Sequence, residues 1–354
     1  MANMLFRKLG VFQIQVVACI ILQAVGCGGG SSETSQGLPD QGAEAINMLQ
    51  LPPYVKFDIK LKRYVRSSRR EADMILIPGG EFFMGSSDFM SEQISSAYSM
   101  TFWDEMPQHI VNLEAFYIDK YEVTNTEYSL YLKDPSSGPV QEPKFWKNPK
   151  FNHPAQPVIG VTWQEAFDYA QSYGKRLLSE AEWEKAASWS GEGKGRLDSG
   201  YARVYPWGNT FSDERLNYNA NRDGPTKVGQ FPLGESRYGV QDMAGNVSEW
   251  VRDVYNKEIY QSQSSVTAIL KANEENATRF NEQGFEDSAG FEHRVHRGGK
   301  WNSWKLKELD VRCARRLHAV RGTQDPGIGF RCAVDAKVVY NDISTLRSPT
   351  EIIE

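Results

Sequence analysis

Short apolar runs separated by turn residues mark the first part of the folded region. Residues 74–77 are all apolar and are followed directly by Pro-Gly-Gly, which predicts a strand that ends in a turn. Residues 81–85 predict the return strand, and a further strand-like stretch extends over residues 110–119. A hairpin followed by a longer strand is therefore expected here.

Two segments combine helix-capping residues with apolar residues at helical spacing. Thr162 precedes Glu165 by three positions, the spacing of a reciprocal capping box, and Ser179 precedes Glu182 in the same way. Alanine and aromatic residues then recur at helical intervals, and Gly174 ends the first segment. The sequence therefore predicts one helix that begins after Thr162 and another that begins after Ser179.

Regular patterns become rarer toward the second half of the chain. A short helix is expected over residues 126–132, where Thr124 and Asn125 are the candidate caps. Beyond Trp189 the helical and strand periodicities largely disappear, although Tyr, Trp, Gly and Asn stay frequent. Residues 256–292 form a charged insertion with few large apolar side chains. Loops and short strands, fixed by aromatic rings, are therefore expected to dominate the second half.

The composition is that of a folded protein without a general affinity for polyanions. The chain has 354 residues, of which 40% are hydrophobic, 12% aromatic and 24% charged. Its formal net charge of −5 gives no general electrostatic attraction to nucleic acid or anionic lipid. Nucleic acid is therefore not an expected partner.

The first 26 residues have the features of a secretory signal peptide. Arg7 and Lys8 form a positive start, residues 9–26 are uncharged and mainly apolar, and small residues precede Cys27. This ending resembles a bacterial lipobox, which implies that Cys27 receives diacylglycerol and becomes the first residue of the mature protein. A retained transmembrane anchor is the alternative, although a run of about eighteen residues barely spans a bilayer.

A flexible tether is expected to follow the signal peptide. Residues 27–44 are rich in Gly, Ser and polar residues, and residues 45–73 form a mixed lead-in segment with a basic run. By resemblance to sorted lipoproteins, the absence of Asp after Cys27 favours the outer membrane. We therefore expect a lipid-anchored protein of the bacterial cell envelope.

The chain contains four cysteines. Removal of the leader removes Cys19 and lipidation uses Cys27, so Cys313 and Cys332 remain as thiols in an oxidising compartment. One disulfide between them is expected, and it would stabilise the fold by about 3 kcal/mol in the chain-entropy model. Two buried free thiols are the alternative.

A series of short motifs carries a resemblance to a known family. The motifs are IPGGEF at 77–82, EVTNTEY at 122–128, VTWQEA at 161–166, GKRLLSEAEWE at 174–184, YPWGN at 205–209, YGVQDMAGNVSEW at 238–250, RGGKW at 297–301 and GFRC at 329–332. In this order they resemble the formylglycine-generating enzyme, or sulfatase-modifying factor, family. The resemblance implies a single α+β domain over residues 74–337, C-type-lectin-like and with little regular secondary structure, and a tail over residues 338–354.

The resemblance also implies structural calcium. The family binds the ion through side-chain oxygens at the positions of Asp242 and Glu249 and through backbone carbonyls at Gly245 and Val247. Hard, partly anionic oxygen ligands on an irregular loop suit Ca²⁺. An ordinary turn with surface acids is the alternative. A second calcium site of the family maps to Asn217, Tyr218 and Asp223.

The family's catalytic copper ion is held by two cysteines, and both are replaced in this chain. Counting from the Gly-Gly turn to Cys313 keeps the family's spacing and places Ser303 and Glu308 at the copper positions. Copper(I) requires soft thiolate ligands, which a hydroxyl and a carboxylate do not replace. Copper is therefore not an expected cofactor. By the same resemblance, Cys313 and Cys332 fall on a structural disulfide.

The remaining polar residues point mainly to structural roles. The histidines form no three-histidine motif of the kind found in related iron-dependent sulfoxide synthases. A loop role is expected for His293 and His296, and metal binding is the alternative. Ser303 has no nucleophile-elbow context. Arginines that alternate with apolar residues near the end of the domain indicate a strand with one solvated face. Alternatively they line a groove for an acidic peptide or glycan, with the candidates Ser248, Trp301, Arg312, Arg315 and Arg316.

These features favour a non-catalytic binding or scaffold lipoprotein. Its domain would bind a protein or glycan partner in the cell envelope, for example in a gliding or secretion assembly. The alternative is an oxidoreductase that modifies a protein cysteine or serine in the manner of formylglycine-generating enzyme. The hypotheses differ at Ser303 and Glu308, because the enzyme needs metal ligands that these side chains do not offer.

Overall fold

The computed structural model describes most of the predicted domain. The described residues are 55–58, 63–67, 73–86, 102–188, 203–261, 290–303 and 307–336. The predicted signal peptide, Cys27, the tether, the tail and most of the predicted insertion lie outside these residues. Within the described ranges, no helix has the length and apolar character needed to cross a bilayer.

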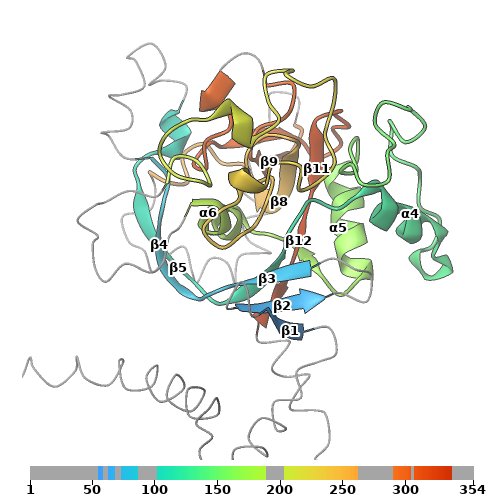
Figure 1. Ribbon diagram of the computed structural model, residues 1–354, viewed down its shortest axis with the longest axis horizontal. Coiled ribbons are helices and arrows are strands. Elements are labelled where there is room, and N and C mark those ends of the chain that lie inside the picture. Colours follow the sequence, from blue (N-terminus) through green and yellow to red (C-terminus); the bar gives the residue numbers. More distant parts are fainter. Residues whose placement is uncertain are drawn as a thin grey trace, which may run out of the picture. The chain divides into compact units, whose positions relative to one another are not determined.

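One sheet brings both ends of the described chain together. Its strand order is β1-β2-β3-β6-β12-β7, and all neighbouring strands are antiparallel. The strands are Val55–Asp58 (β1), Arg63–Ser67 (β2), Asp73–Ile77 (β3), Phe116–Asp119 (β6), Cys332–Asp335 (β12) and Arg176–Leu177 (β7). Because β12 lies between β6 and β7, the end of the described chain completes the sheet that its first strands begin (Figure 1).

A second sheet carries most of the residues discussed below. Its order is β10-β9-β8-β11, with β11 parallel to β8 and the other pairs antiparallel. The strands are Leu317–Val320 (β10), His293–Arg297 (β9), Ser248–Val254 (β8) and Ile328–Phe330 (β11). A separate antiparallel ribbon pairs Gly80–Met84 (β4) with His109–Leu113 (β5).

The predicted helix starts are confirmed. The described α-helices are Asn125–Lys133 (α4), Trp163–Ser172 (α5) and Glu180–Ser188 (α6). Thr124 forms a complete capping box at α4 and Thr162 forms one at α5, while Ser179 and Glu182 exchange the same two hydrogen bonds at α6. Short 3-10 helices lie at Trp103–Glu105, Pro135–Ser137, Asp213–Arg215, Pro232–Gly234 and Lys307–Leu309.

The single strand predicted over residues 110–119 is wrong, because two strands occupy this stretch. The chain leaves β5 after Leu113 and enters β6 at Phe116. β5 pairs with β4, whereas β6 pairs with β3 and β12. A continuous apolar pattern does not reveal this break, because it contains no information about which partner each half joins. The expected hairpin of residues 74–77 with residues 81–85 is also wrong, because β3 and β4 belong to different sheets.

Two large apolar clusters form the core. The first packs α6 against the β4–β5 ribbon and the central sheet strands around Trp183. The second packs α4 and α5 against β11 around Tyr128 and Trp250. Both tryptophans are fully buried, and each indole N–H has an internal acceptor, Glu249 at 2.9 Å for Trp183 and the Val161 carbonyl at 3.0 Å for Trp250. These rings fix segments that lack regular structure of their own.

The predicted disulfide between Cys313 and Cys332 is not present. Both residues are buried free thiols. Cys313 belongs to the cluster around Trp183, whereas Cys332 starts β12 opposite Leu177 and belongs to the cluster around Tyr128. The two thiols therefore pack in different parts of the core, and an even cysteine count could not reveal this separation.

Candidate functional site

The turn that leads into β8 contains the predicted calcium positions and connects two other loops. Asp242, Gly245 and Asn246 have φ angles of 59°, 75° and 56°. Glycine adopts such angles without strain, and Asp and Asn are the other residues that tolerate them best, so this sequence is suited to the turn. The Asn246 N–H donates to the Asn217 carbonyl and the Trp301 N–H donates to the Asn246 carbonyl, both at 2.8 Å. The turn thus positions the loops of Asn217 and Trp301.

Glu249, one of the predicted calcium ligands, is paired with an arginine. Arg331 donates from Nε to Oε2 and from Nη2 to Oε1, both at 2.7 Å, and Trp183 donates to Oε2 at 2.9 Å. The side chains of Arg331 and Glu249 are 0% and 1% exposed. Both carboxylate oxygens of Glu249 are therefore occupied by the Arg331 guanidinium, which would compete with a calcium ion.

Two more carboxyl groups are buried beside this ion pair. Glu122 Oε1 accepts from Asn246 Nδ2 at 3.0 Å, whereas Glu122 Oε2 has no hydrogen-bond partner. Asp242 Oδ2 accepts from the Gly229 N–H at 2.6 Å. Burial and the Asp242 charge raise the pKa of Glu122 well above its usual value, and burial raises the pKa of Asp242 to about 6. Arg331 opposes both shifts without cancelling them.

The donors around this turn fit calcium. Buried carboxylate oxygens with an unpartnered member favour a hard cation, and Arg331 is already committed to Glu249. Within the described residues, no group of three or more His, Cys, Asp or Glu side chains could hold a metal ion, so backbone carbonyls are also needed. The residues that would hold Ca²⁺ are Glu122 and Asp242, with the carbonyls of Gly245 and Val247 that the family resemblance implies.

The residues of the predicted second calcium site face different surroundings. Asn217 is 1% exposed, its Nδ2 donates to the Gly224 carbonyl at 2.9 Å, and its Oδ1 has no partner. Asp223 is exposed and forms an ion pair with Lys150. Tyr218 is half-buried. Asn217 therefore offers a buried oxygen, but the Asp223 carboxylate is turned to the surface.

The two expected copper positions carry no thiolate. Ser303 is 8% exposed, and its Oγ accepts from the Lys300 N–H at 3.1 Å, so its side chain closes a tight turn. Glu308 is half-buried in the 3-10 helix Lys307–Leu309. A turn-forming hydroxyl and a carboxylate do not fit copper(I), which binds through soft sulfur ligands.

The two cysteines of the domain do not supply the missing thiolates. Cys313 and Cys332 are 1% and 0% exposed. Burial raises the pKa of both thiols. A nucleophilic or redox-active cysteine usually has a lowered pKa and access to solvent, and neither thiol has these features.

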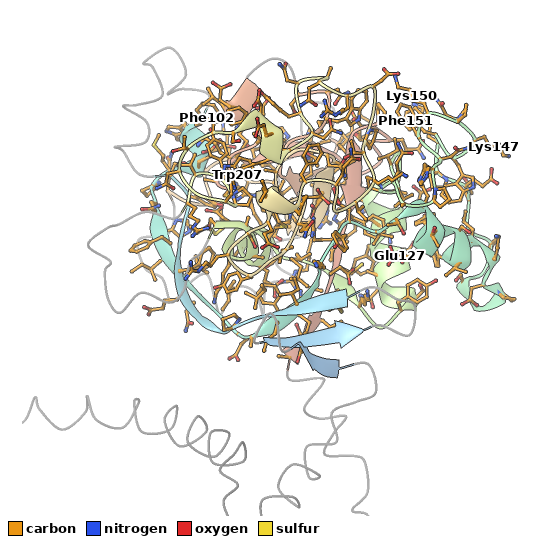
Figure 2. All side chains as sticks on the ribbon, viewed as in Figure 1. Phe102, Glu127, Lys147, Lys150, Phe151 and Trp207 are labelled. Carbon is orange, nitrogen blue, oxygen red and sulfur yellow. The ribbon has the colours of Figure 1, made fainter. Side chains whose placement is uncertain are left out.

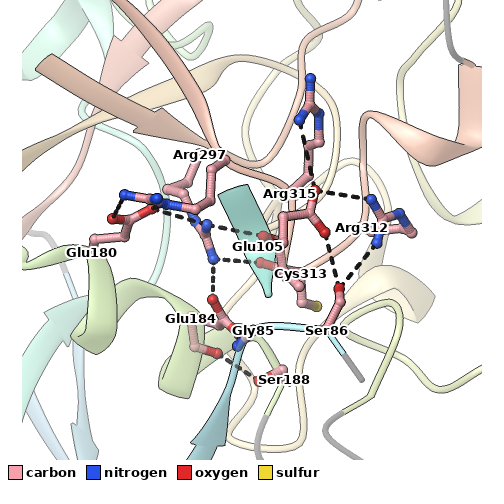
Figure 3. Close-up of polar contacts among 12 residues, drawn as sticks. Gly85, Ser86, Glu105, Glu180, Glu184, Ser188, Arg297, Arg312, Cys313 and Arg315 are labelled. Carbon is pink, nitrogen blue, oxygen red and sulfur yellow. Dashed lines mark hydrogen bonds and ion pairs between the residues drawn. The ribbon is translucent and has the colours of Figure 1, made fainter. Parts of the chain in front are cut away.

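A buried ion-pair network surrounds Cys313 (Figure 3). Arg297 donates to Glu184 from Nη2 and to Glu180 from Nη1, the latter at 3.1 Å, and also donates to the Cys313 carbonyl at 2.7 Å. Arg316 makes two hydrogen bonds to Glu180, at 2.8 and 2.9 Å. Two arginines and two glutamates from distant segments therefore neutralise one another inside the core.

The network continues to the end of β4. Arg312 donates to Glu105 at 3.0 Å, and the Ser86 hydroxyl donates to the same carboxylate at 2.9 Å. The Gly85 N–H donates to Glu184 at 2.7 Å. These contacts hold the β4 end and the 3-10 helix Trp103–Glu105 against α6 (Figure 3). Because each arginine of this network is paired with a carboxylate, we infer that the network stabilises the fold and takes no part in a reaction.

Most of the predicted groove residues do not line a groove. Ser248 is 0% exposed, and Arg312 and Arg316 are each 2% exposed. These arginines lie in the turn before β10, and the interpretation as a strand with a solvated face is therefore wrong for them. Arg315 keeps a side-chain exposure of 12% and contacts Glu105. Arg312 and Arg316 are buried because each pairs with a buried carboxylate, and the local sequence does not reveal these distant partners.

Trp301 is half-buried on an aromatic surface beside the Lys150–Asp223 ion pair. Its indole N–H donates to the Pro326 carbonyl at 3.0 Å, and its ring centroid lies 6.2 Å from that of Phe151. Lys150 Nζ lies 5.8 Å from the Trp301 centroid, and Phe145 packs 6.0 Å from Phe151. Figure 2 shows Lys150 and Phe151 together at one edge of the domain. We refer to Phe145, Lys150, Phe151 and Trp301 as the Trp301 surface.

The loop role expected for His293 and His296 is wrong, because both lie in β9. His296 is 6% exposed, and burial lowers its pKa well below the usual value. His293 Nδ1 lies 2.9 Å from His318 Nδ1 on the neighbouring strand. His109 is part of β5, and His153 is exposed in a turn.

Several residues of the site were not predicted from the sequence. Glu122, Asn246 and Arg331 all lie within the family motifs, so their position in a motif was the available signal. Glu180 and Glu184 lie in another motif but look like ordinary exposed helix residues. Their burial depends on arginines more than a hundred residues away in the chain.

Comparisons with known proteins agree with the motifs. The profile of the family described as "Sulfatase-modifying factor enzyme 1-like domain" matches residues 62–336. The chain is 29% identical over 335 residues to the formylglycine-generating enzyme of Thermomonospora curvata, which covers 79% of this chain and 98% of that protein. It is 32% identical over 327 residues to the protein named serine/threonine-protein kinase pkn1 of Chlamydia pneumoniae, which covers 85% of this chain. The chain spans 45% of the length of that relative.

A solved structure shares the fold. The structure of PvdO from Pseudomonas aeruginosa matches with a TM-score of 0.55 and 26% identity, covering 76% of this chain and 97% of that chain. The expected fold class, α+β and C-type-lectin-like with little regular secondary structure, is confirmed.

Proposed function

This chain belongs to the family of sulfatase-modifying factor enzyme 1-like domains, and we propose that it is a non-catalytic member that serves as a binding or scaffold module. The domain is presented from a lipid anchor in the bacterial cell envelope and binds a protein or glycan partner. Its relatives include proteins named formylglycine-generating enzyme. Under this proposal the chain shares the fold of these relatives but not the activity that their name states.

The donor atoms at the expected copper positions carry this proposal. Ser303 closes a turn with Lys300, and Glu308 is a carboxylate. The described thiols, Cys313 and Cys332, are buried with raised pKa values. Oxidation of a substrate cysteine in the manner of formylglycine-generating enzyme needs sulfur ligands for copper(I), and these donors do not supply them.

The Trp301 surface supports a binding role. The Trp301 carbonyl accepts from the Ala220 N–H at 2.7 Å, its N–H donates to Asn246, and its indole N–H donates to Pro326. The ring is therefore held rigidly, so a partner loses little entropy when it packs against it. A fixed aromatic ring beside the Lys150–Asp223 ion pair offers both apolar and polar contacts, which suit a glycan or a peptide.

Calcium is proposed as a structural ion in this module. Glu122 and Asp242 would hold it with the carbonyls of Gly245 and Val247. The same turn fixes Trp301 through Asn246, so calcium would stabilise the binding surface. The ion would supply charge neutralisation of the buried carboxyls and no step of a reaction.

The anchor proposal rests on the sequence before the domain. Arg7, Lys8, the apolar run and Cys27 fit a lipoprotein signal followed by a Gly/Ser tether. We expect Cys27→Ser to abolish incorporation of labelled palmitate into the chain expressed in a bacterium, with Cys19→Ser as the matched control. Equal labelling of Cys27→Ser would contradict lipidation at this residue.

The activity test uses a cysteine-containing sulfatase peptide. The full chain is incubated with this peptide, copper(I) and O₂, and the peptide mass is followed. No aldehyde is expected, whereas the formylglycine-generating enzyme of Thermomonospora curvata serves as the positive control. Aldehyde formation by this chain would overturn the proposal and support the oxidoreductase alternative.

The binding test compares the half-buried Trp301 with the exposed Trp103. Wild type, Trp301→Ala and Trp103→Ala are used to capture partners from a cell-envelope fraction; Trp103 is 38% exposed and serves as the control. Wild type and Trp103→Ala should capture the same partner, and Trp301→Ala should not. Unchanged capture by Trp301→Ala would refute the assignment of the Trp301 surface.

A further inference from the structure

Two histidines on neighbouring strands face each other at the surface of the second sheet. His293 on β9 pairs with Val320, and His318 on β10 pairs with Val295, so the two histidines are diagonal neighbours on one sheet face. Their Nδ1 atoms lie 2.9 Å apart. His318 is exposed and His293 is partly exposed, so the pair is accessible to a small ligand.

We propose that His293 and His318 bind a divalent transition-metal ion of the copper or nickel type. With metal–nitrogen distances of about 2.0–2.1 Å, two nitrogens in neighbouring positions of a square-planar or octahedral ion are about 2.9 Å apart. In a tetrahedral ion they are about 3.3 Å apart. The observed separation of 2.9 Å is set by the hydrogen bond between the two rings, and it equals the nitrogen spacing of the former geometry, which Cu²⁺ and Ni²⁺ prefer.

Metal binding requires a proton shift within one ring and a rotation of both rings that turns their Nδ1 lone pairs toward the ion. In the hydrogen-bonded pair one ring carries its proton on Nδ1 and the other accepts with its Nδ1 lone pair. When the donor ring moves that proton to Nε2, both Nδ1 lone pairs become free for the metal. Both rings stay neutral, and no proton is released. Water molecules complete the coordination shell.

The surroundings of the pair are compatible with a cation. Tyr255 stacks on the His318 ring with centroids 3.8 Å apart, and its hydroxyl donates to Asp104 at 2.8 Å. This contact orients the His318 ring and places a carboxylate nearby.

The nearby arginines are already neutralised. Arg315 and Arg316 lie close enough to lower the pKa of His318. Arg316 is paired with Glu180 at 2.8 Å, and Arg315 contacts both Glu105 and Asp310. Each positive charge near the pair therefore has its own carboxylate, which reduces its repulsion of a bound cation.

A metal ion at this site would join β9 to β10 and stabilise the folded chain. Binding to the folded state alone raises the melting temperature as the concentration of the ion rises. This site is independent of the proposed calcium turn, because its ligands are imidazole nitrogens rather than carboxylate and carbonyl oxygens.

The test titrates the full chain with Ni²⁺ and, separately, with Cu²⁺. Wild type, His293→Ala, His318→Ala and the control His153→Ala are compared by calorimetry and by thermal melting; His153 is exposed in a turn. Wild type and His153→Ala should bind one more equivalent than the other two variants and should melt at a higher temperature with the ion. The Cu²⁺ paramagnetic resonance spectrum of wild type should show coupling to two imidazole nitrogens.

Two results would overturn the proposal. Equal stoichiometry and equal thermal shifts in all four proteins would mean that the histidine pair does not bind the ion. A spectrum with a single coupled nitrogen, unchanged in His318→Ala, would place the copper elsewhere. Since the cysteines are the same in every protein compared, their contribution cancels in the difference.

Discussion

Removal of Arg297 should strongly destabilise the domain. Its guanidinium is fully buried and donates to Glu184, Glu180 and the carbonyl of Cys313. Arg297→Met keeps much of the side-chain volume but leaves Glu184, itself 0% exposed, with a buried charge and only the Gly85 N–H as a partner. Breaking one side of a buried ion pair costs about 3–5 kcal/mol.

The expected change in melting temperature follows from the size of the domain. For domains of about 150–250 residues, 1 kcal/mol corresponds to about 2–4 °C, so Arg297→Met should melt about 6–20 °C lower than wild type. Denaturant unfolding followed by tryptophan fluorescence gives the free energy directly. Lys257→Met is the control, because Lys257 is 54% exposed and should change stability by less than about 0.5 kcal/mol.

A second substitution separates the buried charge from the lost packing. In Arg297→Met with Glu184→Gln no carboxylate remains opposite the missing guanidinium, so the double variant should regain about 1–2 kcal/mol relative to Arg297→Met. If the two single changes simply add, or if Arg297→Met costs less than about 1 kcal/mol, the network does not stabilise the domain as argued.

The deficit of Arg297→Met should also depend on pH. Burial raises the pKa of Glu184 to about 6 even with Arg297 in place, and loss of the arginine should raise it further. For an acid whose folded pKa is raised, the folded state binds more protons than the unfolded state, so stability falls as the pH rises through this range. The variant should therefore be less impaired at pH 5 than at pH 8, and an equal deficit at both would contradict the assignment.

Three further predictions concern the turn and the thiols. A calcium chelator should lower the melting temperature at pH 8 and have less effect at pH 5, because burial raises the pKa of Asp242 to about 6 and the carboxyl is protonated at the lower pH. The chelator should have no effect on Asp242→Asn. A wild-type melting curve that the chelator leaves unchanged would rule out the site. Gly245→Ala should cost about 2–4 kcal/mol in denaturant unfolding, because its Cβ would lie 2.3 Å from a backbone carbonyl, whereas Gly174→Ala meets no atom within 4 Å and should cost about 1–2 kcal/mol. Cys313 and Cys332 should react with a thiol reagent only after unfolding, as mapped by peptide mass, and rapid labelling of the native chain would contradict their burial.

Local signals were predicted well because their partners are close in sequence. Thr162 and Ser179 each reach the residue three positions on, so the cap and the helix start can be recognised within one turn. The family motifs likewise identified the fold, since they fix turns and close contacts by residue type. The Asp242 and Gly245 turn was located in this way.

Pairings between distant segments could not be predicted. The stretch over residues 110–119 divides between two sheets because β4 competes with β3 and β12 as a partner. The sequence predicts a loop at His293, whereas this residue pairs with β10. At residues 110–119 and around His293 the residue pattern is compatible with a strand, but the first and last residue of each strand depend on the neighbouring strand with which it pairs.

The sequence by itself determined the helix starts and the family fold, and it predicts Ser303 and Glu308 at the copper positions of the family. The tertiary structure alone decided that Arg312 and Arg316 are buried and that the two domain cysteines stay apart. The physical reason is that burying a charged side chain costs much free energy unless a buried opposite charge pairs with it. Here those charges come from Glu105 and from Glu180, which lie 207 and 136 residues away along the chain.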